Sequence, residues 1–508
     1  NIYVERVRAN VKRQALYCDM LGSARWVGEL AQRYPAREIT PLTPWFANIS
    51  IHDVEITGCS TLVDVSALPE KPVKNFFFGN VKAHCDRIGK ICDATKFSMK
   101  DVRIESCDTV MRIDNCDYAS FFGFSNVTTG SSVKIEKTGG ECRYLNVQTY
   151  PLVPVNYQSI RPGEVWLDTE GKPIQAHGFQ VTFREGKYYW YGEDKTHTLF
   201  GTNRMFGGVR CYSSTDFYNW KDEGRIIEPA TDPHSPLHHC QKLERPHILY
   251  CAKTGRYVCW LKSQSNDGHF VILEAEHFMG PYHFVRNLKP NGFAVGDFDM
   301  YADPDTGKGY VWFERPHWEQ ICAELSDDYT NVNGRYSEHF VGKVPPFTRE
   351  AAAHFVMDGK HYIYTSGTTS YTPNPSEVAV FDDYHGEYTV LGNPHIGDEY
   401  AHSFCSQITS VIKIPGKDLY VAMADRWLPH TNKTDIPKKD WQSFLTRYKD
   451  HRPYPKDFAT PKVADRFYTL VNPNQDVYKA TYVFLPIVVK DGIPMIEWKD
   501  EWKLENYE

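Results

Sequence analysis

The sequence predicts an all-β chain: a partial right-handed parallel β-helix over residues 1–150, followed by a five-bladed β-propeller over residues 151–508. Three observations predict this fold class. Short β-rich phrases recur closely in the first part, glycine-led aromatic strands recur more widely in the second, and the chain holds 32 tyrosines, 28 phenylalanines and 12 tryptophans. Because 508 residues exceed what one hydrophobic core usually organises, two domains are expected.

Four phrases of nearly alternating apolar and polar residues mark the first domain. They begin at Asn48, Asn75, Lys96 and Ala119, and each turns at a polar pair. Their period of roughly 21 to 27 residues is typical of stacked coils in a parallel β-helix, where each coil buries its inner face only against its neighbours.

A second repeat follows two prolines, Pro151 and Pro154, which suit a connector because proline interrupts a strand ladder. Five glycines then each introduce a short aromatic or β-branched strand, which excludes a helical interpretation. A spacing of roughly 50 to 70 residues assigns one propeller blade to each strand. The strands are Gly186-Lys-Tyr-Tyr-Trp-Tyr, Gly255-Arg-Tyr-Val-Cys-Trp, Gly309-Tyr-Val-Trp-Phe, Gly359-Lys-His-Tyr-Ile-Tyr and Gly416-Lys-Asp-Leu-Tyr-Val.

Charge and cysteine usage argue against several classes of partner. The net charge of −7 is spread along the chain without a lysine or arginine run, so neither nucleic acid nor an anionic membrane is an expected partner. No stretch approaches the roughly 20 apolar residues of a transmembrane helix. The 13 cysteines lack zinc-site spacing, and His234, His238, His239 and His247 lie in a loop-rich stretch, so no metal site and no cofactor are expected.

Eight phrases follow one another along the second domain. They are Ala176-His-Gly, Tyr188-Tyr-Trp-Tyr-Gly-Glu, Cys211-Tyr-Ser-Ser-Thr-Asp-Phe-Tyr-Asn-Trp, Glu244-Arg-Pro-His, Thr348-Arg-Glu-Ala, Thr365-Ser-Gly-Thr, Ser406-Gln-Ile-Thr and Ala424-Asp-Arg-Trp. In this order they resemble glycoside hydrolase family 43, and most closely its exo-β-1,3-galactanase-like branch. The resemblance implies a five-bladed propeller whose central funnel binds a terminal sugar, and it is compatible with a structural ion in the channel.

The first domain resembles the C-terminal coils of glycoside hydrolase family 28, including the stretch that begins at Leu68 before a coil. That family's catalytic signatures do not occur in this segment. They are an Asn-Thr-Asp triplet, a paired aspartate, a Gly-His-Gly and an Arg-Ile-Lys. Pectin cleavage by the first domain is therefore not expected.

Glu350 is the candidate general acid. The alanine run after it would raise the pKa of its carboxyl towards neutrality, and by resemblance it stands where the family keeps its acid. The alternative is a glutamate paired with Arg349. Asp297 matches the family's aspartate that tunes and orients the acid, with Asp299 as the rival two residues away.

The base is where the chain departs from most of family 43. Those members carry an aspartate in the first blade, whereas Ala176-His-Gly supplies no carboxylate. In the galactanase-like branch a glutamine faces the water, and Gln407 matches it. An amide is no ordinary base, so it acts through an imidic tautomer or orients water that another group deprotonates. Glu193 and Glu244 are the candidates for that group.

Further residues are expected to contact sugar. Glu244 matches a sugar-contacting glutamate of the branch, with a structural pair to Arg245 as the alternative. Glu193, Thr368, Thr369, Asp425, Arg426 and Trp427 are the other substrate-binding candidates. An arginine and an aromatic plate suit sugar recognition. The phrase Trp312-Phe-Glu-Arg-Pro-His-Trp-Glu is unusually large and charged for a subsite loop, which is compatible with an acidic or branched substrate.

Together these residues predict an exo-acting, inverting glycoside hydrolase that releases terminal galactose from β-1,3-galactan or related plant polysaccharide side chains. The alternatives are an α-L-arabinofuranosidase and a non-catalytic carbohydrate-binding protein. The joint presence of Glu350, Asp297, Glu244 and Gln407 favours the enzyme. An oligo- or polysaccharide is the expected partner, and a secreted or periplasmic location is expected.

Overall fold

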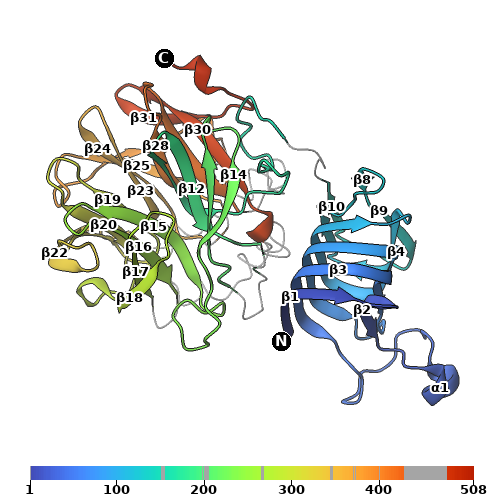
Figure 1. Cartoon of the computed structure of the whole chain (residues 1–508). Helices are drawn as coiled ribbons and strands as arrows, with labels where there is room; N and C mark the ends of the chain where they lie inside the picture. The colour runs from blue at the N-terminus through green and yellow to red at the C-terminus, as the bar shows by residue number, and fades with distance from the viewer. Residues whose placement is uncertain are drawn as a thin grey trace. The chain divides into compact units, whose positions relative to one another are not determined.

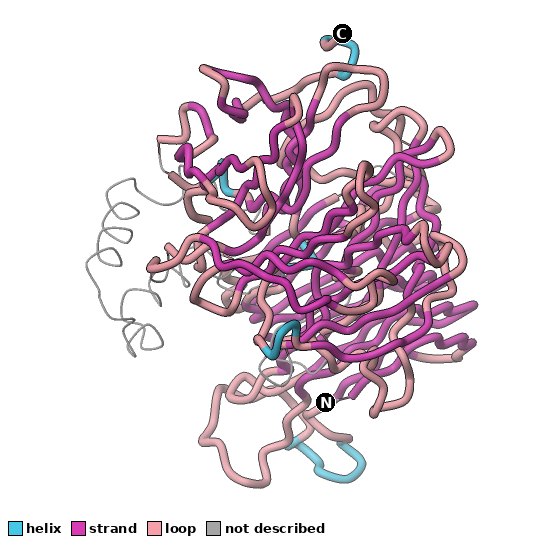
Figure 2. The backbone as a smooth tube through the Cα atoms, turned by 90° about the vertical axis from the view of Figure 1, so that its left-hand side faces the viewer, coloured by secondary structure: helices cyan, strands magenta, loops and turns pink. Residues whose placement is uncertain are grey.

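The computed structural model describes residues 2–149, 155–196, 198, 205–264, 268–343, 347–369, 371, 373–399, 401–427 and 477–508 (Figure 1). The chain divides into two compact units, Asn1–Val155 with Glu170–Lys172 and Asn156–Thr169 with Pro173–Glu508. The predicted domain boundary between residues 150 and 151 lies outside the described residues. Strands and loops dominate both units (Figure 2), and no described helix is long and apolar enough to cross a membrane.

The first unit is built on a parallel sheet whose main path runs β1-β3-β4-β5-β9. Ile49 lies opposite Phe76 and Ser98 lies opposite Ser120, so successive coils are offset by 27 (76 − 49) and 22 (120 − 98) residues. This arrangement is consistent with the predicted β-helix. The strands are β1 (Ile2–Asn10), β2 (Gln14–Asp19), β3 (Ala47–Ser66), β4 (Val73–Glu105), β5 (Val110–Asp117), β6 (Ser120–Phe122), β7 (Ser125–Asn126), β8 (Ser131–Ser132), β9 (Lys134–Gly139) and β10 (Asn146–Gln148), with a short helix α1 (Ala24–Val27) between β2 and β3.

The repeated asparagines of the coil phrases occupy corners. Asn48 and Asn75 both have positive φ, 56° and 52°, a conformation that asparagine tolerates better than most residues. The Asn75 side-chain amide donates a 2.8 Å hydrogen bond to Asn48 Oδ1 one coil away. The same residue type therefore recurs because the same corner recurs.

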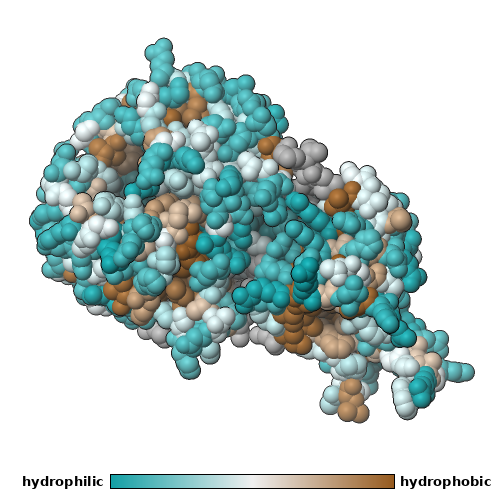
Figure 3. Space-filling model, viewed as in Figure 1, coloured by the Kyte–Doolittle hydropathy of each residue, from teal (hydrophilic) through white to brown (hydrophobic). Residues whose placement is uncertain are grey.

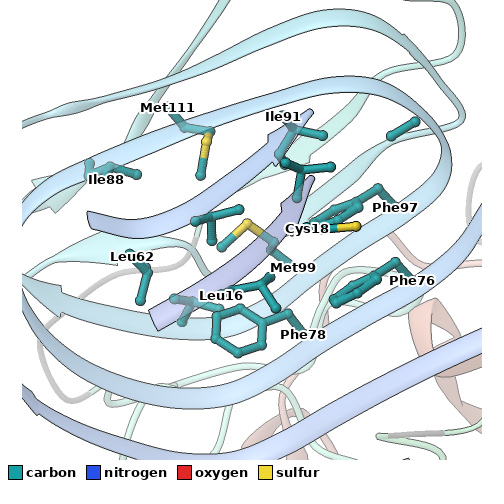
Figure 4. Close-up of a cluster of buried hydrophobic side chains, with 14 of the residues drawn as sticks. Leu16, Cys18, Leu62, Phe76, Phe78, Ile88, Ile91, Phe97, Met99 and Met111 are labelled. Atoms are coloured by element: carbon teal, nitrogen blue, oxygen red, sulfur yellow. The ribbon is translucent and has the colours of Figure 1, made fainter. Parts of the chain in front are cut away.

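The inner faces of the coils form one hydrophobic core (Figure 4). Phe76 and Phe97 stack with ring centroids 4.8 Å apart and an interplanar angle of 5°. Leu62, Ile88 and Met99 are wholly buried beside them. Each coil thus covers the apolar face of the next, as the alternating phrases require.

The second unit is a propeller of five antiparallel blades, as predicted. The five glycine-led strands are β12, β16, β20, β24 and β29, the second strand of each blade, and a short strand β27 (His395–Ile396) adds to β31. Blade one consists of β11 (His177–Arg184), β12 (Lys187–Glu193), β13 (Val209–Ser214) and β14 (Lys221–Ile227), and blade two of β15 (Leu243–Cys251), β16 (Arg256–Ser263), β17 (His269–Ala275) and β18 (His283–Leu288). Blade three consists of β19 (Phe298–Ala302), β20 (Gly309–Glu314), β21 (Gln320–Leu325) and β22 (Val332–His339), and blade four of β23 (Glu350–Met357), β24 (Lys360–Ser366), β25 (Glu377–Phe381) and β26 (Thr389–Gly392). Blade five consists of β28 (Gln407–Lys413), β29 (Tyr420–Arg426), β30 (Thr481–Lys490) and β31 (Ile493–Glu497).

Aromatic packing joins the last blade to the first. Trp190 of β12 lies edge-on to Tyr482 of β30, with ring centroids 4.5 Å apart, and it also contacts Phe484. Both ends of the unit meet here, because Ile160 and Trp502 exchange backbone hydrogen bonds. The buried rings close the circle of blades, while the visible surface of each unit is mainly hydrophilic (Figure 3).

Candidate active site

The propeller topology brings polar side chains to one pocket of about 120 Å³. First strands of the blades begin at this end of the propeller and second strands finish there, which places Glu244, Glu350 and Gln407 beside Glu193 and Lys262. The pocket is lined by Glu193, Lys195, Lys242, Glu244, Arg245, Lys262, Gln264, Asp297, Glu350, Tyr371, Gln407 and Trp427.

A β-bulge recurs at the start of the first strand in several blades. The strand register shifts after His177, Glu244 and Glu350, and the residues that follow them, Gly178, Arg245 and Ala351, have φ of 53°, 52° and 50°. A bulge redirects the side chains around it. The same backbone irregularity thus accompanies the pocket carboxyls of blades two and four.

Glu350 has the properties expected of a protonated acid. Burial raises the pKa of its carboxyl well above the usual range, and the nearby carboxyls of Asp297 and Glu314 raise it further. Arg349, the alternative ion-pair partner of Glu350, makes its contacts with other residues. Its guanidinium donates to the side-chain and backbone oxygens of Thr365, at 2.9 and 2.7 Å, and lies 3.5 Å from Glu377.

Asp297, rather than Asp299, lines the pocket. Its carboxylate lies 2.6 Å from Lys262 Nζ and 2.9 Å from Arg245 Nε. Burial opposes ionisation, yet Arg245 and Lys262 together hold the pKa of Asp297 below its usual value. Asp299 instead accepts a 2.6 Å hydrogen bond from the His354 backbone amide and lies 3.0 Å from the His247 ring, so it ties blades together.

Glu244 pairs with lysines and not with the neighbouring Arg245. Lys262 Nζ lies 2.6 Å from one of its oxygens and Lys242 Nζ lies 3.5 Å from the other. Burial alone would raise the pKa of Glu244, but Lys262, followed by Lys242, holds it far below the usual value. The alternative pair with Arg245 is thus replaced by an ion pair with Lys262 from the adjacent strand.

Gln407 is held by donors and acceptors on both sides of its amide. Its oxygen accepts hydrogen bonds from Arg245 Nη2 at 2.9 Å and from Trp427 Nε1 at 3.3 Å. Its nitrogen donates to Ser366 Oγ at 3.0 Å and to Glu350 Oε1 at 3.4 Å. The amide is therefore oriented towards the candidate acid.

Glu193 lies at the end of β12 in blade one, which is not adjacent to blade four, where Glu350 lies. It accepts a 2.9 Å hydrogen bond from the Arg245 backbone amide and forms an ion pair with Lys195. Burial raises the pKa of Glu193, and the charge of Glu244 raises it further against the effect of Lys195.

The remaining sugar-contact candidates divide into two groups. Trp427 lines the pocket, and Asp425 lines a smaller hollow beside it while accepting hydrogen bonds from the His177 ring and the Gly178 amide at 2.9 and 2.8 Å. Arg426 alternates to the other face of β29. It donates to the Phe404 carbonyl at 2.8 Å and lies over the Trp498 ring.

Thr368 and Thr369 are likewise used to hold a loop. Thr368 shares a 2.8 Å hydrogen bond with Thr348, and Thr369 accepts one of 2.8 Å from Asn374. Both threonines are buried, and neither lines the pocket. The structure therefore brings Arg426, Thr368 and Thr369 near the site without placing them in its wall.

Several pocket residues were not found from the sequence. Lys262 is the most important of them. The sequence signal that could have found it is its position directly after the buried apolar run Val258–Leu261. Lys195, Tyr371 and the buried Glu314 behind the pocket carried no comparable signal. Burial raises the pKa of Glu314 to about 7.

One group of described residues has the donors of a metal site. The ligating atoms of His238, His239 and Cys240 lie within 4.8 Å of one another. No metal site was predicted here, because these histidines lie in a loop-rich stretch without helix or strand spacing. Three consecutive residues meet because the loop turns back at this point, where the Cys240 amide approaches His238 Nδ1 at 3.4 Å.

Comparison with known proteins finds one family model and a set of similar solved structures. Residues 179–411 match the family model described as "Glycosyl hydrolases family 43". A solved family 43 β-1,3-galactosidase is similar with a TM-score of 0.56 and 27% identity over 69% of this chain and 65% of its own. A second, solved with galactodeoxynojirimycin, has a TM-score of 0.55 and 27% identity over 68% of this chain and 100% of its own.

An exo-β-1,3-galactanase from Clostridium thermocellum has a TM-score of 0.52 and 25% identity over 68% of this chain and 66% of its own. The chain thus spans just under two thirds of the first structure's length and all of the second's. No protein with a curated record matches it.

Proposed function

We propose that the protein is an exo-acting, inverting glycoside hydrolase of family 43, whose family model matches residues 179–411 of the propeller. It releases terminal galactose from β-1,3-galactan or related plant polysaccharide side chains. The observation that carries this proposal is Glu350, a buried carboxyl in the pocket whose pKa is raised by burial and by its acidic neighbours. Such a group keeps its proton to higher pH than an ordinary glutamate does and can donate it to a leaving oxygen.

In the proposed reaction Glu350 transfers its proton to the glycosidic oxygen as the bond to the anomeric carbon breaks. A water molecule attacks the same carbon from the opposite face, and its proton passes to a base. The products are free galactose of inverted configuration and a shortened chain. Glu350 then regains a proton from solvent before the next turnover.

We assign the base to Glu193. Gln407 Oε1 already accepts hydrogen bonds from Arg245 and Trp427, and the amide nitrogen has no usable lone pair, so Gln407 orients water or sugar. A carboxylate whose pKa is raised is a better base than one whose pKa is lowered, which favours Glu193 over Glu244.

Asp297 and Lys262 are assigned to positioning. The Asp297 carboxylate, kept ionised by Arg245 and Lys262, raises the pKa of Glu350 and thereby keeps it protonated. Lys262 joins Asp297 to Glu244 through two contacts of 2.6 Å, so the carboxylates of blades two and three are fixed relative to each other.

The test is release of galactose from β-1,3-galactan, followed by proton NMR. The wild-type protein is expected to release α-galactose first, and Glu350→Gln is expected to release none, because an amide cannot donate the required proton. Glu193→Gln is expected to lose turnover, and added azide should restore it with α-galactosyl azide as the product. Azide is an anionic nucleophile, so its attack needs no base.

Other outcomes separate the alternatives. β-Galactose as the first product would refute inversion. Release of arabinose from arabinogalactan in place of galactose would identify an α-L-arabinofuranosidase. Binding of glycans without turnover by the wild-type protein would identify a carbohydrate-binding protein.

We further propose a secreted or periplasmic location, since a polymeric substrate is met outside the cytoplasm. The match of the propeller to family 43, with its polysaccharide-degrading relatives, supports this location. Fractionation of the source cells is the test, and recovery of the protein only with cytoplasmic markers would contradict it.

A further inference from the structure

In four blades a described residue that follows the second strand lines the pocket: Lys195, Gln264, Tyr371 and Trp427. Tyr371, in this connection of blade four, lines the pocket itself. The equivalent connection of blade three runs from Arg315 to Glu319, between β20 and β21. It belongs to the large and charged phrase that the catalytic assignments above leave unused.

This connection starts next to a pocket wall. The backbone amide of Glu314 donates a 2.9 Å hydrogen bond to the carbonyl of Asp297, whose side chain lines the pocket. Trp318 follows only four residues later. It belongs to the blade-three connection, at the end of the propeller where the second strands finish and the pocket residues gather.

Hydrogen bonds hold the connection in one conformation. The Glu314 carboxylate accepts a 2.7 Å hydrogen bond from the His317 amide. The Arg315 amide donates to the Glu319 carbonyl at 3.0 Å, and the Trp318 amide donates to the Arg315 carbonyl at 2.8 Å. A preorganised loop loses little conformational entropy when it binds a ligand.

The loop presents one aromatic ring to solvent. Trp318 is 64% exposed, whereas Trp312 of the same phrase is wholly buried. The Arg315 guanidinium lies 5.3 Å from the Trp318 ring centroid and 5.6 Å from that of Phe293, which fixes it between two rings. Its charge is balanced by Glu319, 2.8 Å away.

We propose that Trp318 is the platform for the sugar residue on the leaving-group side of the cleaved bond, an inference that rests on the proposed function. The leaving oxygen must lie beside Glu350, so the departing chain leaves the pocket on the side of blades three and four. An exposed ring there stacks on the apolar face of a sugar. Because Glu319 neutralises Arg315, the site suits a neutral sugar rather than an acidic one.

The test is calorimetric titration of the inactive Glu350→Gln protein with galactose, β-1,3-galactobiose and β-1,3-galactotriose. Adding Trp318→Ala is expected to weaken binding of the two oligosaccharides about 2- to 10-fold, the value of an aromatic contact. Binding of galactose should not change, because galactose reaches only the pocket. Trp318→Phe should retain part of the oligosaccharide affinity.

Trp26→Ala in the same Glu350→Gln background is the matched control. Trp26 is 78% exposed and also has an arginine, Arg25, over its ring at 5.0 Å, but it belongs to the other unit. Equal weakening for galactose and oligosaccharides, no weakening by Trp318→Ala, or no binding of any oligosaccharide would each refute the platform. The proposed function is judged separately, by galactose release from the wild-type protein.

Discussion

Lys262→Met removes the cation that joins two catalytic-site carboxylates. Lys262 Nζ lies 2.6 Å from both Glu244 and Asp297, and its side chain is only 6% exposed. The pKa of Lys262 is raised above its usual value because Asp297 and Glu244 outweigh the effect of burial. Methionine fills a similar volume but leaves both carboxylates without this partner.

Breaking a buried ion pair by removing one partner costs about 3–5 kcal/mol of unfolding free energy. The loss depends on pH. In the wild-type protein the folded-state pKa of Glu244 is depressed, so its stabilising contribution is fully present above the unfolded value of about 4.3 and is lost as pH falls through the folded value. Without Lys262, the largest charge that opposes burial is lost, so the folded pKa of Glu244 rises from its wild-type value. The penalty of the variant is then largest at neutral pH and shrinks as the carboxyl takes up a proton in acid.

Urea unfolding followed by tryptophan fluorescence at pH 7.5 and pH 5 measures this effect. Only Trp26 and Trp45 of the 12 tryptophans precede residue 155, so the signal reports mainly on the propeller. Lys242→Met is the matched control, because Lys242 is 29% exposed and lies 3.5 Å from Glu244, and its loss should stay below about 1 kcal/mol. A Lys262→Met penalty equal to that of the control, or one that does not change with pH, would refute the reasoning.

Three further predictions address the acid, the bulge and the coils. Asp297→Asn should move the basic limb of the kcat/KM profile to lower pH, because loss of its charge lowers the pKa of Glu350; an unmoved limb would contradict this assignment. Ala351→Val should lower the propeller's urea midpoint by the equivalent of about 1–3 kcal/mol, since φ at this residue is 50°, with Ala351→Gly as the tolerated control. Gly89→Ala should destabilise the first unit in thermal circular dichroism, because the new Cβ would lie 1.9 Å from the Val63 carbonyl oxygen; an unchanged transition would show that the coil can shift.

Metal addition tests the cluster of His238, His239 and Cys240, for which no metal site was predicted. The donors of His238, His239 and Cys240 are compatible with zinc, and Cys240→Ser should weaken zinc binding in calorimetry if they act together. Equal zinc binding by the variant and the wild-type protein would show that Cys240 is no ligand.

The sequence by itself determined the repeat structure of both units. Asparagines recur at Asn48 and Asn75 because each coil turns through the same corner, and the five glycine-led strands recur because each blade needs a buried second strand. Such periodic signals arise from local geometry and from burial against the next repeat, so they can be recognised before any tertiary contact is known.

The candidate acid and three of its pocket neighbours were also predicted from the sequence through the family resemblance, but the lysine that joins two of them was not. Glu350, Gln407, Glu244 and Asp297 come from blades two to five and are separated by long stretches of sequence. The pairing of β15 with β16 places Lys262 opposite Glu244, and the packing of blade two against blade three brings it to Asp297.

Only the tertiary structure decided which of two residues that are close in the sequence faces the pocket. Asp297 lines it while Asp299 ties strands together, and Trp427 lines it while Arg426 points to the other face of β29. The bulges after Glu244 and Glu350 shift the alternation by one residue. Side-chain direction in a strand depends on this register, and the register depends on pairing between strands that the linear pattern does not specify.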